Sequence, residues 1–175
     1  MRGLMGAELI PGVTAGHALL FVAIGLVFRF LRRVPMIYVV ARLPGTFAHE
    51  LLHYLVGWLL GAKPVSLSIR PYRTVAGRLI YGRVEFARLR WWNEVPVGLA
   101  PLLLIPLAAW LFLLSCLAPP SALISPLLMI LAWQCLLSCM PSLRDWFHIV
   151  SGSVVIAIVT VLFLIVLELM GVPHV

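Results

Sequence analysis

The fold of this chain is decided by the apolar run at residues 36–60, MIYVVARLPGTFAHELLHYLVGWLL, which contains His49-Glu50-Leu51-Leu52-His53. Two histidines four residues apart share one face of a helix, with Cβ atoms about 5–6 Å apart. Imidazoles at this spacing can bind one metal ion, and zinc is the usual ion for such a motif. Glu50 leaves the helix about 100° from His49, so it can serve as a base for an attacking water without being a ligand.

A simpler interpretation is that His49 and His53 are hydrogen-bonded inside a helix bundle and bind nothing. The metal interpretation is favoured because an ionisable Glu50 between two histidines in an apolar run is costly to keep at membrane depth without a function.

The composition predicts an integral membrane protein. Of the 175 residues, 63% are apolar and 11% are charged, against about 25% charged residues in a soluble domain; the mean hydropathy is +1.10. The formal net charge is +7, and the basic residues cluster in the connections between apolar runs. Anionic lipid headgroups and membrane topology explain such clusters better than nucleic acid does.

The apolar runs predict an all-α polytopic protein with about five transmembrane helices, forming one membrane-embedded domain over residues 1–175. Pro44 should kink the second span or begin a new helix near Thr46. His17, in the first span, is expected to hydrogen-bond across the bundle. The expected spans are 12–31, 36–60, 95–117, 122–140 and 146–170.

The region at residues 64–90 differs from the spans. Apolar and polar residues alternate from Val65 to Arg70, turn residues follow, and a second extended run covers 79–89. This pattern predicts a small β-hairpin at the membrane surface between the second and third spans, with an amphipathic connector as the alternative. An exposed strand edge there could pair with an extended substrate.

A catalytic zinc usually has three protein ligands and an open position. Asp145, the only aspartate, opens an apolar helix after Pro141 and is the expected third metal ligand. Ser142-x-x-Asp145 also has the spacing of a capping box, so Asp145 could be only a cap, and His148 is a competing ligand or an orienting residue.

Two further features concern the cysteines and the orientation of the chain in the membrane. Cys135 and Cys139 share a helix face, where a second metal site is conceivable, although both suit an apolar interior.

The hairpin and the segment before Asp145 should lie on one membrane face because two spans separate them. That face carries most of the arginines, which predicts a cytoplasmic hairpin and N-terminus.

The motif His49–His53 inside a span, the β region after it, and Pro141-Ser142-Leu143-Arg144-Asp145 opening a later span resemble the site-2 protease group of intramembrane zinc metalloproteases. The resemblance covers residues 44–149 and is nearest to small, divergent bacterial members.

The resemblance implies hydrolysis of a peptide bond in or beside a transmembrane segment of a membrane-protein substrate. It also implies zinc held by His49, His53 and Asp145, with Glu50 moving the proton, and location in a prokaryotic cytoplasmic membrane. The alternative is a metal-binding membrane protein without protease activity, such as a transporter component or an inactive scaffold. Neither a substrate nor a regulatory membrane partner can be named from the sequence. The candidate oxyanion donors are Asn93, Gln134, Ser142 and Arg144.

Overall fold

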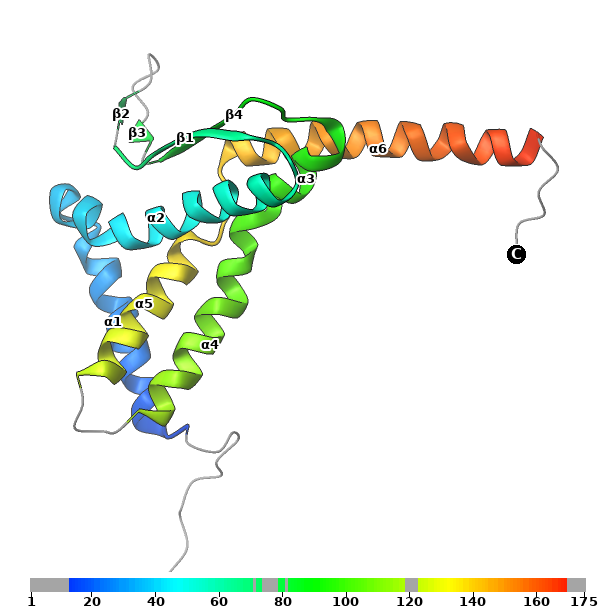
Figure 1. The fold of residues 1–175 in the computed structure, drawn as a ribbon. Helices are drawn as coiled ribbons and strands as arrows, with labels where there is room; N and C mark the ends of the chain where they lie inside the picture. Colours follow the sequence, from blue (N-terminus) through cyan, green and yellow to red (C-terminus); the bar gives the residue numbers. More distant parts are fainter. Residues whose placement is uncertain (1–12, 71, 74–78, 81, 119–122, 170–175) are drawn as a thin grey trace, which may run out of the picture. The chain divides into compact units, whose positions relative to one another are not determined.

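The computed structural model describes residues 13–70, 72–73, 79–80, 82–118 and 123–169, and these residues are mostly helical, as predicted (Figure 1). In the described residues the helices form five continuous segments, because α3 runs through a 3₁₀ turn, η1, into α4. The first residues of the predicted spans at 12 and 122, and the last at 170, lie outside the described residues. The helices are α1 (Ala15–Leu31), α2 (Pro35–Leu59), α3 (Trp91–Leu99), η1 (Ala100–Leu103), α4 (Leu104–Leu117), α5 (Ile124–Ser138) and α6 (Leu143–Leu169).

Two helices begin earlier than predicted, because side chains satisfy the backbone groups of their first turns. The third span is predicted from residue 95, but α3 begins at Trp91, where the Arg90 N–H donates to Oδ1 of Asn93 at 2.7 Å. The last span is predicted from residue 146, but α6 begins at Leu143. Such contacts compensate donors that a helix end leaves without intrahelical partners.

Helix α2 is a single helix with Pro44 inside it. The predicted alternative of a new helix near Thr46 is therefore wrong. Next to Pro44, Gly45 packs so closely on α5 that a Cβ there would lie 2.7 Å from the Gln134 carbonyl oxygen. Arg42 Nη2 donates to the Leu137 carbonyl at 2.7 Å. Packing of this helix stretch onto the end of α5 outweighs the helix-breaking tendency of proline.

The chain divides into two compact units. Of the described residues, the first unit consists of those up to His49 together with those of Leu102–Met140, and the second consists of those of Glu50–Pro101 and those from Pro141 onward.

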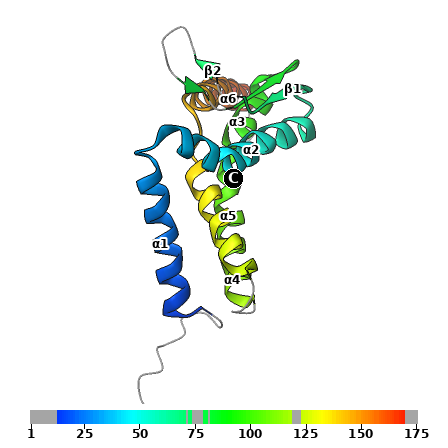
Figure 2. The same cartoon turned by 90° about the vertical axis from the view of Figure 1, so that its left-hand side faces the viewer.

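In the first unit α4 packs along α5, and α1 lies against α5 (Figures 1 and 2). Partly buried aromatic rings join its three helices: Phe21 stacks on Trp133 with ring centroids 5.0 Å apart, and Phe112 meets Phe21 edge-on at 4.9 Å. Leu104 and Met129 are fully buried. Apolar burial of this kind is the main source of packing stability in a helix pair.

In the second unit α3 packs against α6 at glycine contacts. A Cβ at Gly98 would lie 2.7 Å from Cγ1 of Ile149, and a Cβ at Gly152 would lie 2.7 Å from Cγ2 of Val95. Small residues allow two helix backbones to approach closely, so polar side chains on these helices come within bonding distance of one another.

The second unit also contains the β region, which confirms the predicted hairpin. Strand β1 (Pro64–Ser68) pairs antiparallel with β4 (Arg83–Phe86), and β2 (Tyr72–Arg73) pairs with β3 (Leu79–Ile80). The Phe86 ring lies against Gly57 of α2, where any side chain would overlap it. Residues 71, 74–78 and 81 of the predicted hairpin lie outside the described residues.

The expectation for His17 is wrong. Its Nδ1 lies 2.9 Å from Thr14 Oγ1 and accepts from the Thr14 N–H at 3.2 Å, forming a capping box at the start of α1. A local partner three residues away replaces the predicted partner across the bundle, because the first turn of a helix leaves its N–H groups unsatisfied.

Two segments of the described chain are long and apolar enough to cross a membrane. They are Trp91–Leu117, made of α3, η1 and α4, and Leu143–Ile165 within α6. Helices α1 and α5 are apolar but shorter.

Candidate metal centre

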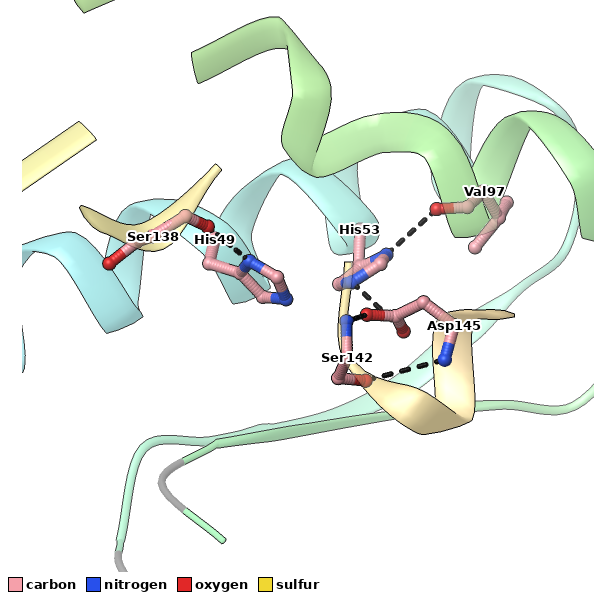
Figure 3. A network of polar contacts seen from close by, with 6 residues as sticks. All are labelled: His49, His53, Val97, Ser138, Ser142 and Asp145. Atoms are coloured by element: carbon pink, nitrogen blue, oxygen red, sulfur yellow. Dashed lines mark hydrogen bonds and ion pairs between the residues drawn. The ribbon is translucent and has the colours of Figure 1, made fainter. Parts of the chain in front are cut away.

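Helix α2 presents His49 and His53 from consecutive turns, and each ring is oriented by a backbone carbonyl (Figure 3). His49 Nδ1 lies 2.7 Å from the carbonyl oxygen of Ser138, and His53 Nδ1 lies 2.8 Å from that of Val97. A carbonyl oxygen can only accept a hydrogen bond, so each Nδ1 carries the hydrogen. In the neutral ring Nε2 then carries the lone pair that a metal ion requires.

Asp145 reaches His53 from the start of α6 (Figure 3). Its Oδ1 lies 3.2 Å from His53 Nε2, and both side chains are largely buried. A neutral His53 of this tautomer directs a lone pair at the carboxylate oxygen, and the two groups repel unless a cation lies between them. The pair is therefore arranged so that a metal ion between the two atoms could bind both.

The same carboxylate also caps α6. Asp145 Oδ2 accepts from the Ser142 N–H at 2.6 Å, and the Asp145 N–H donates to Ser142 Oγ at 3.3 Å. The two sequence interpretations of Asp145 are thus compatible, because one oxygen closes the capping box and the other faces His53. The cap fixes the carboxylate in the orientation that a ligand needs.

His49, His53 and Asp145 together form a group that can hold a metal ion. One ligand atom from each lies within 4.8 Å of the other two, and His53 and Asp145 are buried. Since both histidines belong to one continuous helix, their mutual spacing is set by the helix itself. Among the described residues this is the only group of three or more potential His, Cys, Asp or Glu ligands so placed. Cys135 and Cys139 are buried thiols.

His148 lies outside this group. Its Nδ1 is 3.9 Å from Oε1 of Glu94 on α3, and Ser151 Oγ donates to the other oxygen of Glu94 at 3.0 Å. His148 is therefore placed to pair with Glu94, one turn along α6 from Asp145, and the structure does not bring it together with His49 and His53.

Glu50 is buried, with 9% of its surface exposed, and the β region lies against it. A side chain at Gly82 would overlap the Glu50 carboxylate. Because glycine at position 82 leaves this space, the backbone preceding β4 can come close to the carboxylate. Gly82 was not predicted from the sequence, since a lone glycine in an extended run carries no signal for its partner.

Two of the four candidate oxyanion donors, Asn93 and Gln134, use their amide groups to bind backbone carbonyls. Asn93 Nδ2 donates to the carbonyls of Arg88 at 3.2 Å and Leu60 at 3.5 Å, and Gln134 Nε2 donates to the Ala41 carbonyl. These amides bind backbone groups within their own units. The orienting carbonyls of Ser138 and Val97 were not predicted, because backbone acceptors have no residue-type signature.

Comparison with protein-family models, with curated proteins and with solved structures yields no match to this chain. The geometry of the residues themselves therefore carries the functional inference.

Proposed function

We propose that this protein is a zinc-dependent endopeptidase that cleaves a peptide bond in or near a transmembrane segment of a membrane-protein substrate. The observation that carries this proposal is the 3.2 Å approach of Asp145 Oδ1 to His53 Nε2, with His49 on the preceding helix turn. Two imidazoles and a carboxylate form a ligand set found in catalytic zinc sites.

The donor set supports zinc over other ions. Bonds of about 2.0–2.1 Å at tetrahedral angles place two ligand atoms about 3.3 Å apart, and the His53–Asp145 separation is 3.2 Å. Imidazole nitrogens suit zinc, whereas magnesium and calcium prefer oxygen ligands. The three ligand atoms all lie within 4.8 Å of one another.

Each residue then has a defined part in the proposed hydrolysis. A zinc ion held here supplies a Lewis acid that activates water and polarises the scissile carbonyl. Glu50 accepts a proton as the water oxygen bonds to the carbonyl carbon, and it returns that proton to the amine nitrogen as the C–N bond breaks. Val97 and Ser138 hold the two imidazoles through their backbone carbonyls.

Exposure of apolar helices supports a membrane location. In the apolar 18-residue window of the segment Leu143–Ile165, only 6% of the residues are buried by the rest of the chain. A core helix of a soluble domain would be mostly buried, so this helix requires an apolar environment such as lipid. The His-Glu-x-x-His motif and the acidic residue opening a later helix also resemble the site-2 protease group. A substrate segment could pair with an open edge of the β1–β4 sheet.

The test combines metal content with cleavage. Purified protein should contain one zinc per chain by elemental analysis, and His49→Ala or His53→Ala should remove it. Glu50→Gln should keep zinc and abolish cleavage of single-span membrane segments in proteoliposomes. Glu168→Gln, the same change at an exposed residue near the end of α6, is the matched control and should cleave normally. Full activity of Glu50→Gln, or a wild-type protein that binds no zinc, would overturn the proposal. Zinc binding without any cleavage would favour the non-proteolytic alternative.

A further inference from the structure

Three arginines gather where α1 ends and the chain turns into α2. Arg29 lies in the last turn of α1, and Arg32 and Arg33 are the first two residues after this helix ends. With Leu26 and Phe30 they line a surface pocket of about 420 Å³. All three arginines are exposed, and we call this site the arginine pocket.

The charge of the arginine pocket is not neutralised by the described part of the chain. The ion pairs given by those residues are His53–Asp145, Arg83–Glu85 and His148–Glu94, none of which includes a pocket arginine. Three like charges within five residues repel one another, so a bound anion would stabilise them. The pocket is thus complementary to a negatively charged group.

Aromatic contacts hold two of these guanidinium groups. The Cζ atom of Arg33 lies 5.3 Å from the centroid of the Phe30 ring, and that of Arg32 lies 5.8 Å from the centroid of Tyr38. A guanidinium stacked on a ring keeps its N–H groups in the plane available for hydrogen bonds. Such forks match pairs of phosphate oxygens.

The apolar surface beside the pocket identifies the kind of anion. Leu26 and Phe30 are 60% and 62% exposed, and Val22 and Val27 on α1 are more than half exposed. A free phosphate would use only the arginines, whereas a phospholipid would place its phosphate on them and its chains along α1. We propose that the arginine pocket binds the phosphate group of an anionic glycerophospholipid.

This proposal rests on the membrane location proposed above but not on proteolysis. The test uses the full-length protein in detergent micelles and counts bound lipids by native mass spectrometry, with phosphatidylglycerol, phosphatidylcholine and soluble glycerol phosphate as probes. We expect selective retention of phosphatidylglycerol. The double variant R32Q/R33Q should weaken the binding of phosphatidylglycerol by about tenfold or more, because each basic group near an anionic headgroup strengthens lipid binding.

The matched control is R70Q/R88Q, which removes the same charge at two exposed positions outside the pocket. It should change phosphatidylglycerol binding by less than twofold. The variant R32K/R33K keeps the charge but loses the planar forks, and it should bind with intermediate affinity. Zinc content, measured on the same samples, should not change.

Three results would overturn the proposal: equal binding of phosphatidylglycerol and phosphatidylcholine, equal losses in the pocket and control variants, or full displacement of the lipid by equimolar glycerol phosphate. The last would indicate a site for a free phosphate compound. Because lipid binding is counted directly, its failure is distinct from an absence of zinc or of cleavage.

Discussion

The helix pair α4–α5 and the helix pair α3–α6 are both closely packed, but they are built from different residues. The first packs around large apolar groups, with Phe21 of α1 stacked on Trp133 and Leu104 and Met129 fully buried. The second meets at Gly98 and Gly152, and it includes the carboxylates of Glu94 and Asp145.

This difference indicates that one helix pair contributes mainly to stability, whereas the other carries the ionisable groups of the candidate site. Ionisable groups in an apolar setting are unfavourable unless they are paired, and on α3–α6 they are paired: Asp145 with His53, and Glu94 with Ser151. Glycine contacts bring the backbones of α3 and α6 close enough for Ser151 to donate to Glu94. The aromatic pair stabilises its unit without presenting any such group.

The largest expected effect is on zinc affinity, through Asp145 at the start of α6. Asp145→Ala removes a proposed zinc ligand, so zinc affinity should fall by more than about 100-fold, since even residues that only orient ligands contribute 10–100-fold. Competition with a chromophoric chelator measures this. Ser142→Ala is the control: it removes Oγ but keeps the N–H that donates to Asp145 Oδ2, so affinity should stay within about threefold. Equal losses in both variants would mean that the cap, not the ligand, matters.

The second largest effect is expected on thermal stability, at the contact of Gly98 with α6. In Gly98→Ala the new Cβ would lie 2.7 Å from Ile149 Cγ1 and 3.0 Å from the Asp145 carbonyl oxygen. Overpacking of this kind costs about 1–3 kcal/mol and should lower the Tm in detergent. Gly16→Ala is the matched control, because its nearest neighbour would be Thr14 Oγ1 at 3.5 Å. A Tm equal to that of the control would show that α3 and α6 do not depend on a small residue.

A change in the aromatic pair should affect stability alone. Phe21→Leu removes the stacking on Trp133 and the edge contact with Phe112, which should reduce the free energy of unfolding by about 0.5–1.5 kcal/mol. Zinc affinity should remain within twofold of wild type. Thermal unfolding and the chelator titration measure the two quantities, and a tenfold loss of zinc affinity would abolish the separation of roles.

The smallest effect is expected at Ser138, although this residue orients His49. The acceptor is its backbone carbonyl, which any residue provides, so Ser138→Ala should leave zinc affinity within twofold. The variant loses only the 3.2 Å contact from Arg42 to Ser138 Oγ, worth about 0.5–1.5 kcal/mol. A large fall in zinc affinity would indicate that the hydroxyl itself fixes the imidazole.

Much of this arrangement could be predicted from the sequence where residue type and spacing carry the information. The His49–His53 spacing defines a helix face, alternation after Lys63 indicates strands, and Ser142-x-x-Asp145 indicates a helix start. Each is a local pattern, and each is present in the structure. Proximity of Asp145 to His53 was an expectation from chemistry, since the two are distant in the chain, and it is confirmed.

What could not be predicted depends on tertiary placement or on the backbone. The carbonyls of Val97 and Ser138 and the approach of Gly82 to Glu50 leave no sequence pattern. His17 was assigned a distant partner and instead bonds to Thr14. Asn93 and Gln134 were candidate donors for catalysis, and their amides bind backbone carbonyls. In these cases a polar side chain satisfied a nearby main-chain group first.

The two oxygens of Asp145 have one more consequence. Oδ2 accepts the Ser142 N–H at 2.6 Å, which occupies one of its lone pairs, whereas Oδ1 faces His53 Nε2 at 3.2 Å. A bidentate carboxylate, which calcium sites commonly use, is therefore disfavoured here. The backbone at the beginning of α6 would thus bear on ion selectivity, because its N–H group competes with a bound ion for the second oxygen of the aspartate.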